Sequence, residues 1–175
     1  MAKVGIFFGT DTGNTRKFAK QIATKLGDVA DKPVNINKAS VDDLLAYDVL
    51  ILGSPTYGEG ELPGMSAGHD NESWEEFLPK LAGQDFSGKN VAIYGLGNQK
   101  SYPVEFVDAM YYVYEQFKQC GATLIGAWDT EGYNFQASKA VVDNRFVGLA
   151  LDQENQKYLT SIRLGTWLKD LGLIF

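Results

Sequence analysis

The sequence predicts an α/β fold in which a doubly wound, five-stranded parallel sheet carries helices on both faces. Three observations predict it. Short apolar runs alternate with segments of helical periodicity along the chain; the runs are apolar at successive positions, as in strands buried on both faces; and 45% of the 175 residues are hydrophobic, enough for one core. We expect one domain over residues 1–175, because no linker, repeat or low-complexity tract interrupts the alternation.

Six apolar runs mark the expected strands. The run at residues 4–8 is clear, and the run at 34–36 is weak. The remaining runs occupy residues 49–52, 91–94, 124–128 and 146–151. The last two flank residues 129–145, a stretch longer than the usual loop of about 4–6 residues. They are therefore candidates for the two halves of one interrupted strand.

Three stripes of apolar side chains, spaced three and four residues apart, mark the long helices. The first stripe has lysine and threonine outside it and consists of Phe18, Ala19, Ile22, Ala23 and Leu26. The second consists of Phe106, Val107, Met110, Tyr111, Tyr114 and Phe117, and the third of Leu164, Trp167, Leu168 and Leu171. Shorter helices are expected at residues 41–46 and 73–81.

Composition disfavours several classes of function. The chain carries 16 basic and 22 acidic residues, a net charge of −6, which disfavours a nucleic-acid binder and a polybasic membrane anchor. A single cysteine, Cys120, excludes an internal disulfide framework and a cysteine-ligated cluster; we expect it to be a semi-buried small hydrophobe. No metal site and no Ser-His-Asp set can be nominated, and the single histidine, His69, is expected to be exposed.

The chain begins without a signal-peptide pattern and has no apolar span of bilayer length, so we expect a cytoplasmic protein. Its acidity is concentrated in residues 54–79, which hold six acids and no lysine or arginine. One interpretation is a solvated loop and helix start, where acids offset the helix dipole. The other is a docking face for a basic partner. Charge alone favours the first.

Ligands of open parallel sheets bind beyond the carboxyl ends of the strands, and three loops leave those ends. The first reads Gly-Thr-Asp-Thr-Gly-Asn-Thr at residues 9–15 and places hydroxyls and backbone N–H groups at a helix N-terminus, where the dipole favours an anion. It matches neither a Walker loop nor a dinucleotide fingerprint. A monophosphate held by neutral donors fits this loop best; the alternative is an ordinary capped helix start.

The second loop, residues 54–61, and the third, residues 96–102, each combine an aromatic ring with glycine-freed backbone. The rings are those of Tyr57 and Tyr102. Two rings that face a gap, with a phosphate site at its end, would hold a flat aromatic nucleotide by stacking and backbone hydrogen bonds. For either tyrosine alone, loop packing is the commoner explanation.

Together the three loops resemble those of flavodoxins. Residues 9–15 resemble the phosphate loop T-x-T-G-x-T, residues 55–61 (Pro-Thr-Tyr-Gly-Glu-Gly-Glu) the second loop, and residues 95–102 (Gly-x-Gly-Asn-Gln-x-x-Tyr) the third. Residues 129–145 resemble the insertion that splits strand five in long-chain members, in a sheet of order 2-1-3-4-5. Within the family, residues 30–37, 61–64 and 71–77 are most similar to flavodoxins that reduce nitrogenase.

The resemblance implies FMN as the only cofactor and one-electron transfer between semiquinone and hydroquinone as the function, with no catalytic residue. The implied FMN-binding residues lie in the three loops: Thr10, Asp11, Thr12, Gly13, Asn14 and Thr15; Pro55, Thr56, Tyr57, Gly58, Glu59 and Gly60; and Leu96, Gly97, Asn98 and Tyr102. The implied partners are redox proteins with basic docking faces: the nitrogenase iron protein, and a flavodoxin reductase or pyruvate oxidoreductase. A monomer is expected.

Two positions bear on the redox potential that the resemblance implies. The peptide between Gly58 and Glu59 would turn over so that its carbonyl accepts the proton of reduced N5, a movement that glycine permits. Where the third loop of the family usually reads Gly-Asp-Gln, this chain has Asn98, which removes one charge near the flavin pyrimidine. The acids of residues 54–79 disfavour an anionic hydroquinone and lower the potential.

Other functions stay open at this stage. A flavodoxin of general metabolism would serve another low-potential acceptor. An NAD(P)H–quinone flavin reductase would need a nicotinamide site, which we do not find. A phosphoacceptor receiver domain would need an aspartate at the end of the third strand, where this chain has Gly53 and Ser54.

Overall fold

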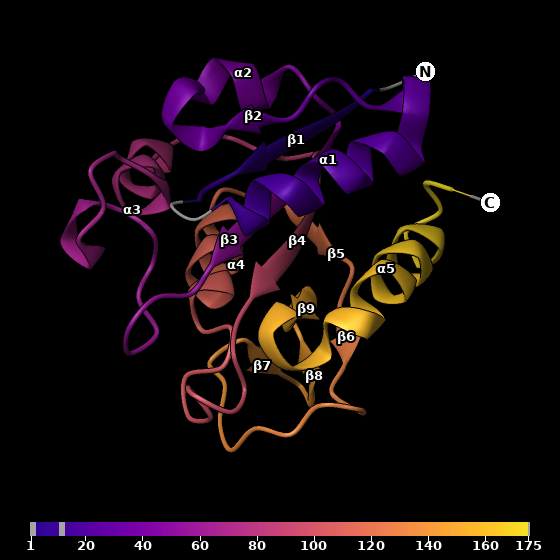
Figure 1. The fold of residues 1–175 in the computed structure, drawn as a ribbon. Coiled ribbons are helices and arrows are strands. Elements are labelled where there is room, and N and C mark those ends of the chain that lie inside the picture. Colours follow the sequence, from indigo (N-terminus) through magenta and orange to yellow (C-terminus); the bar gives the residue numbers. More distant parts are fainter. Residues whose placement is uncertain (1–2, 11–12, 175) are drawn as a thin grey trace.

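The computed structural model describes residues 3–10 and 13–174. Its main sheet runs in the order β2 (Val34–Asn35), β1 (Val4–Phe8), β3 (Val49–Pro55), β4 (Asn90–Leu96) and β5 (Thr123–Ile125), and a sixth strand, β9 (Leu149–Leu151), also pairs with β4. All these pairings are parallel. The predicted α/β class and the strand order 2-1-3-4-5 are confirmed (Figure 1).

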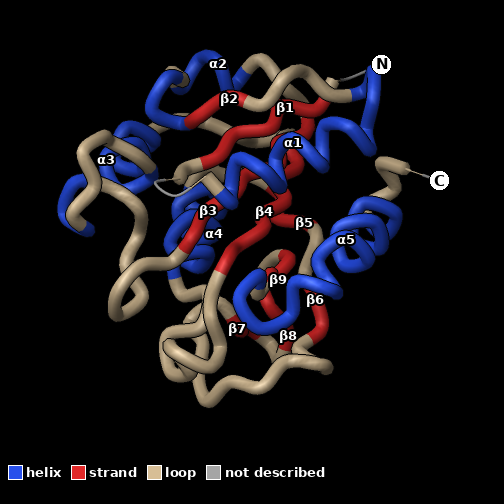
Figure 2. The backbone as a smooth tube through the Cα atoms, in the orientation of Figure 1, coloured by secondary structure: helices blue, strands red, loops and turns tan. Residues whose placement is uncertain are grey.

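The fifth strand is split, as the resemblance implied. β5 pairs with the first half of β4 and β9 with its second half, along the same edge. Between them lies a small antiparallel sheet of β6 (Trp128–Asp129), β8 (Arg145–Phe146) and β7 (Val141–Val142), in the lower part of Figure 2. The predicted continuous runs at 124–128 and 146–151 are wrong at this point, because the chain turns out of the main sheet at Gly126 (φ +87°) and Trp128 and Phe146 join the small sheet.

Helices cover both faces of the sheet. α1 (Asn14–Leu26) and α5 (Gln153–Asp170) pack on one face, against side chains that include Ile6, Ile51 and Tyr94. On the other face lie α2 (Val41–Leu45), α3 (Trp74–Phe77) and α4 (Ala109–Gln119). Four 3₁₀ segments complete the described elements: η1 (Gly27–Val29), η2 (Ile36–Lys38), η3 (Met65–Ala67) and η4 (Leu78–Leu81). Successive strand residues serve opposite faces, so the strands read as continuous apolar runs.

The long helices follow their predicted stripes with one exception. In α1, the side chains of Phe18, Ala19, Ile22 and Leu26 are buried, as expected. The second stripe is wrong in its first turn: Phe106 and Val107 are fully buried, but Val107 has φ +52° and α4 begins only at Ala109. Two residues buried in a loop therefore had the same apolar spacing as the buried face of a helix. Cys120 is 7% exposed, in line with its expected packing role.

The segment between β5 and β9 is fixed to the rest of the fold by a half-buried tyrosine, Tyr133. The Tyr133 hydroxyl donates to the carbonyl of Ala150 at 2.6 Å and accepts from the Trp128 ring N–H at 3.0 Å. The Arg163 guanidinium of α5 lies 4.0 Å from the Tyr133 ring centroid. Burial raises the pKa of Tyr133 to about 12, so its hydroxyl keeps its proton at neutral pH.

Within the described parts of the chain, none of the helices has both the length and the apolar character that crossing a bilayer demands.

Candidate functional site

A cleft opens where the carboxyl ends of β3, β4 and β9 meet the start of α1. Of the residues that the structure describes, ten line it: Asn14, Pro55, Thr56, Tyr57, Leu96, Gly97, Asn98, Tyr102, Gln153 and Glu154. The first eight are predicted binding residues from all three loops. Parallel strands direct their following loops to one edge of the sheet, which is why segments more than 80 residues apart in sequence meet here.

The first loop brings the amino end of α1 to this edge. Gly13, with φ +96°, precedes the helix, and its N–H donates to the Thr10 hydroxyl at 2.8 Å. Gly13 has no side chain that could accept from the first-turn N–H groups, and a helix N-terminus of this kind suits an anion. Thr15 is buried and its carbonyl accepts from the Tyr94 hydroxyl at 2.8 Å, which ties the loop to β4. The predicted residues Asp11 and Thr12 lie outside the described residues.

The second loop closes into a tight hairpin between Tyr57 and Glu61. The Tyr57 N–H donates to the Glu61 carbonyl at 2.9 Å, and the Glu61 N–H donates back at 2.6 Å. Gly58 (φ +48°) and Gly60 (φ +95°) supply the left-handed backbone of the turn. Gly58 and Glu59 are exposed, and Glu59 and Gly60 line a neighbouring hollow rather than the cleft.

Support for the second loop comes from two elements. The Thr56 hydroxyl accepts from the Ala109 N–H at the start of α4 at 3.2 Å. The ring of Tyr57 meets the ring of His69 edge-on, with centroids 4.3 Å apart. The expectation that His69 is exposed is wrong: it is 9% exposed, because it packs against Tyr57. A histidine in an acidic loop gives no sequence signal for such an aromatic contact.

The third loop presents an exposed ring at the rim of the cleft. Tyr102 is 46% exposed, although its N–H donates to the Asn98 carbonyl at 2.9 Å and closes the turn. Gly97 lets this loop lie flat on the fold, because a Cβ there would stand 2.9 Å from the Phe106 ring. The Asn98 side-chain oxygen accepts from the Ser101 N–H at 3.0 Å and from the Asn155 amide at 2.9 Å.

Sequence reasoning missed two residues of the cleft, Gln153 and Glu154. Both begin α5 directly after β9, the second half of the split strand. The rule that ligands bind at carboxyl strand ends would have found them, had it been applied to the end of this half-strand as well.

Comparison with known proteins decides the family. The family model for flavodoxin matches residues 6–167. The chain belongs to the flavodoxin family. It is 52% identical to a flavodoxin of Klebsiella pneumoniae over 171 residues, covering 98% of this chain and 97% of that one. It is 45% identical to flavodoxin 1 of Escherichia coli K12 over 176 residues, covering 98% and 94%.

A solved structure agrees with this assignment. The crystal structure of Fusobacterium nucleatum flavodoxin, which is bound to flavin mononucleotide, aligns with a TM-score of 0.88 at 33% identity and covers 98% of each chain. Flavodoxins are electron-transfer proteins and not enzymes, so the chain falls in this class.

The acids of this flavodoxin's second loop and the segment after it divide into two groups. Glu59, Glu61, Asp70 and Glu72 are exposed, whereas Glu75 and Glu76 are half-buried at the start of α3. Glu76 accepts from the Ser73 N–H at 2.8 Å and the Met65 N–H at 3.1 Å. Partial burial acts to raise the pKa of Glu76, but these hydrogen bonds outweigh it and hold the pKa below its ordinary value. The helix-start interpretation therefore fits Glu75 and Glu76, whereas the docking face stays a prediction for the exposed group.

Proposed function

We propose that this flavodoxin carries single electrons on one FMN held in the cleft. The observation that carries the proposal is the pair of tyrosines, Tyr57 and Tyr102, which come from different loops and line one cleft beside the amino end of α1. Tyr102 keeps nearly half of its surface exposed, surface that a stacked ring would cover. FMN, when bound, supplies the one-electron chemistry of its isoalloxazine ring.

The residues present fit FMN by the chemistry of their donors. The N–H groups of the first turn of α1, with Asn14 and Thr10 beside them, suit the phosphate. The hydroxyl of Thr56 and the backbone of Gly97 and Asn98 suit the polar edge of the ring system. Hydrophobic contacts come from Pro55, Leu96 and the two tyrosine rings, which give the mixed lining of a nucleotide site.

The chain's own groups favour single-electron transfer in two ways. The left-handed backbone of Gly58 lets the 58–59 peptide adopt either orientation, so its carbonyl oxygen is the atom we assign to accept a hydrogen bond from an N–H group of the bound ring. Exposed carboxylates of Glu59 and Glu61 and that of Glu154 at the cleft oppose the arrival of negative charge. The hydrogen bond would stabilise the one-electron-reduced state, and the carboxylates would lower the potential of the second one-electron step.

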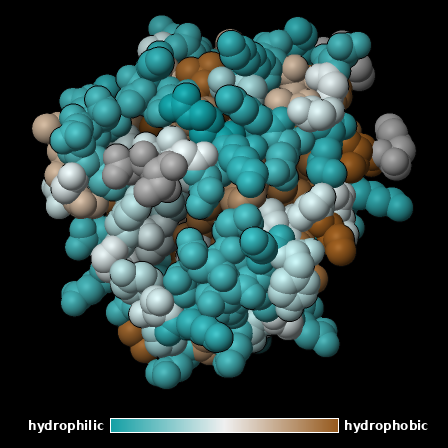
Figure 3. Space-filling view, in the orientation of Figure 1, coloured by the Kyte–Doolittle hydropathy of each residue, from teal (hydrophilic) through white to brown (hydrophobic). Residues whose placement is uncertain are grey.

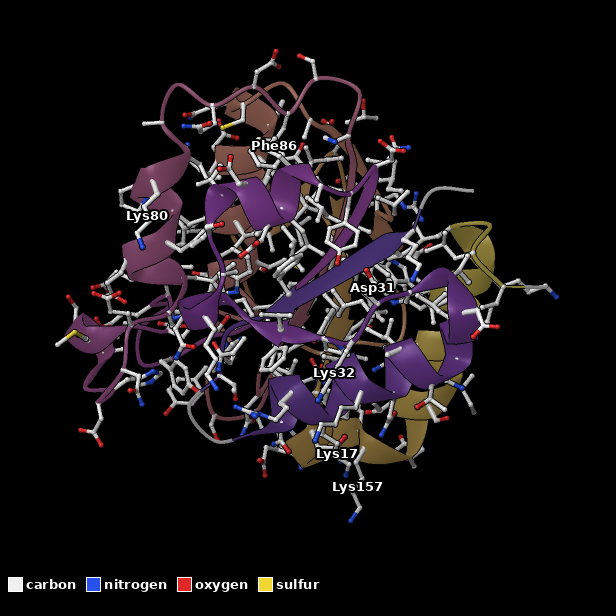
Figure 4. The ribbon with its side chains drawn as sticks, turned by 90° about the horizontal axis from the view of Figure 1, so that it is seen from above. Lys17, Asp31, Lys32, Lys80, Phe86 and Lys157 are labelled. Carbon is white, nitrogen blue, oxygen red and sulfur yellow. The ribbon has the colours of Figure 1, made fainter. Side chains whose placement is uncertain are left out.

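The charges also suggest how partners approach. Glu59, Glu61, Asp70 and Glu72 form an exposed acidic face beside the second loop, which suits a basic docking surface. On another side, α1 carries Arg16, Lys17, Lys20 and Lys25 around a surface groove of about 650 Å³. Figure 3 shows hydrophilic side chains gathered over α1, and Figure 4 shows Lys17, Lys32 and Lys157 lying on one side of the molecule.

As the finer proposal, the acidic face docks the nitrogenase iron protein as electron acceptor, with a flavodoxin reductase or pyruvate oxidoreductase as donor. The support for this client is the sequence similarity of residues 30–37, 61–64 and 71–77 described above. We also propose that the protein is a cytoplasmic monomer. The alternative client is another low-potential acceptor of general metabolism.

Two experiments test these proposals. Purified protein should be yellow, should release FMN on acid treatment and should take it up again in a one-to-one ratio; protein that neither contains nor binds FMN would overturn the carrier proposal. With reduced protein as sole donor, the purified nitrogenase iron protein should be reduced, and the rate should fall with salt and in the E59Q/E61Q variant. An iron protein that accepts electrons at the same rate from the parent protein and from the E59Q/E61Q variant would refute the acidic docking face.

A further inference from the structure

A buried carboxylate stands directly behind the third loop. Asp152 follows β9, is 0% exposed and precedes the first residue of α5. Its Oδ1 accepts from the Asn155 N–H at 3.0 Å, which caps the helix. The Asn155 side-chain amide also donates to both carboxylate oxygens, at 3.1 and 2.9 Å.

The same carboxylate holds Gln99 of the third loop twice. The Gln99 backbone N–H donates to Asp152 Oδ2 at 3.0 Å, and the Gln99 side-chain amide donates to the same oxygen at 2.9 Å. Gln99 is 4% exposed, and its side-chain oxygen accepts from the Asn134 N–H of the segment between β5 and β9. Asp152 therefore joins the loop, the helix and that segment at one buried point.

One amide connects this point to the cleft. Asn155 donates from its side chain to Asp152 and also to the side-chain oxygen of Asn98, which lines the cleft. All the recorded hydrogen bonds of the Asp152 carboxylate come from N–H donors, the pattern of an acceptor-only, charged group. A helix N-terminus stabilises such a charge.

We propose that Asp152 is a positioning residue for the third loop and the buried negative charge that lowers the redox potential of the bound cofactor. The inference rests on the carrier function proposed above and deepens it. Glu154 lines the cleft and Asp152 does not. Solvent screens the two charges differently, because Glu154 is exposed, whereas Asp152 lies inside the protein, where ions do not reach. The carboxylate of Asp152 therefore lowers the potential more than that of Glu154 does.

The first test compares potentials in the FMN-loaded protein. The D152N variant keeps a good helix cap, because asparagine caps nearly as well as aspartate. We expect it to shift the second one-electron equilibrium toward the reduced state roughly tenfold, or ~59 mV, and to do so equally at low and high salt. The E154Q variant should give a smaller shift that disappears in high salt. As a distant control on the same helix, D170N should leave the equilibrium unchanged.

A double variant separates charge from structure. Q99E/D152N exchanges the amide and the acid within the same buried pair, so it keeps one negative charge there. We expect its potential to return toward that of the parent. Two results would overturn the assignment of the charge. One is a D152N variant whose potentials equal those of the parent at both salt concentrations. The other is a shift in D152N that the double variant does not reverse at all.

The positioning role is tested without the cofactor. In FMN-free protein, D152N should speed hydrogen exchange at the backbone N–H groups of Gln99 and Asn155 at least tenfold, while exchange in β1 stays as in the parent. Unchanged exchange at both groups would refute the positioning role. Because this measurement needs no FMN, it stands even if the chain fails to bind FMN, an outcome that would instead overturn the proposed function.

Discussion

Replacing Asn98 by aspartate adds one charge to the cleft with little other change. The Asn98 side-chain oxygen only accepts hydrogen bonds, from Ser101 and Asn155, and a carboxylate oxygen can accept both. The residue is half-buried, so its surroundings lie between protein interior and solvent in dielectric response. At ~10 Å and an effective dielectric constant of ~20–40, a unit charge costs an added electron about 0.8–1.7 kcal/mol.

That energy corresponds to a second one-electron potential about 35–70 mV more negative in Asn98→Asp, since ~1.4 kcal/mol equals 59 mV for one electron. The assay is a spectroscopic redox titration at low and at high salt, and the shift should shrink in high salt. A matched control is Asn90→Asp, an exposed asparagine at the opposite end of β4, which should leave the potential unchanged. An unchanged or raised potential in Asn98→Asp would refute the electrostatic reasoning.

Three further variants test other parts of the site. Gly58→Pro forbids the positive φ of the second loop and should narrow the gap between the two one-electron potentials, measured by redox titration. Tyr94→Phe leaves the buried Thr15 carbonyl without its hydrogen bond and should cost about 1 kcal/mol, a fall in Tm of about 2–4 °C by calorimetry. Glu76→Gln should destabilise the protein at neutral pH, because the folded-state pKa of Glu76 is lowered and its contribution is present above the ordinary pKa of 4.5. As pH falls through the lowered pKa, parent and Glu76→Gln should converge in urea unfolding.

Each of these variants has a control and a contradicting outcome. Gly83→Pro strains a left-handed turn outside the cleft and should leave the gap between the potentials intact; equal narrowing in both variants would mean general damage. Tyr158→Phe alters a tyrosine that is 74% exposed, and a Tm loss as large as that of Tyr94→Phe would refute the role of the buried bond. Glu72→Gln removes an exposed acid, and a pH dependence like that of Glu76→Gln would contradict the hydrogen-bond explanation.

Much of the fold follows from periodicity because the sheet is covered on both sides. A strand such as β1 buries every residue, so its sequence is apolar throughout and its position is readable. The edge strand β2 is shorter and half-buried, which is why its signal is weak. The start of α4 was misplaced for the opposite reason: burial of Phe106 and Val107 is genuine, but their burial comes from loop packing.

The candidate site was predictable where loops follow strands and unpredictable where side chains meet across elements. Tyr57 and Tyr102 were placed by strand-end position alone. The packing of His69 on Tyr57, and the hold of Asp152 on Gln99 across 53 residues, depend on tertiary geometry that no local pattern records. Periodicity identifies which face of an element is buried, but not which polar groups meet there.

The segment between the two halves of the fifth strand supports the chain that follows the third loop through backbone N–H groups of its own. Gln136 and Ala137 donate their N–H groups to the Pro103 carbonyl at 2.7 and 2.9 Å, and Lys139 donates its N–H to Asp108 at 2.8 Å. Any residue except proline supplies such a donor. The side chains of Gln136 and Ala137 can thus be exchanged without loss of this support, so the outer surface of the segment can vary while the cleft keeps its shape. Lys139 is more constrained, because its side chain also donates to the Tyr112 hydroxyl at 2.8 Å.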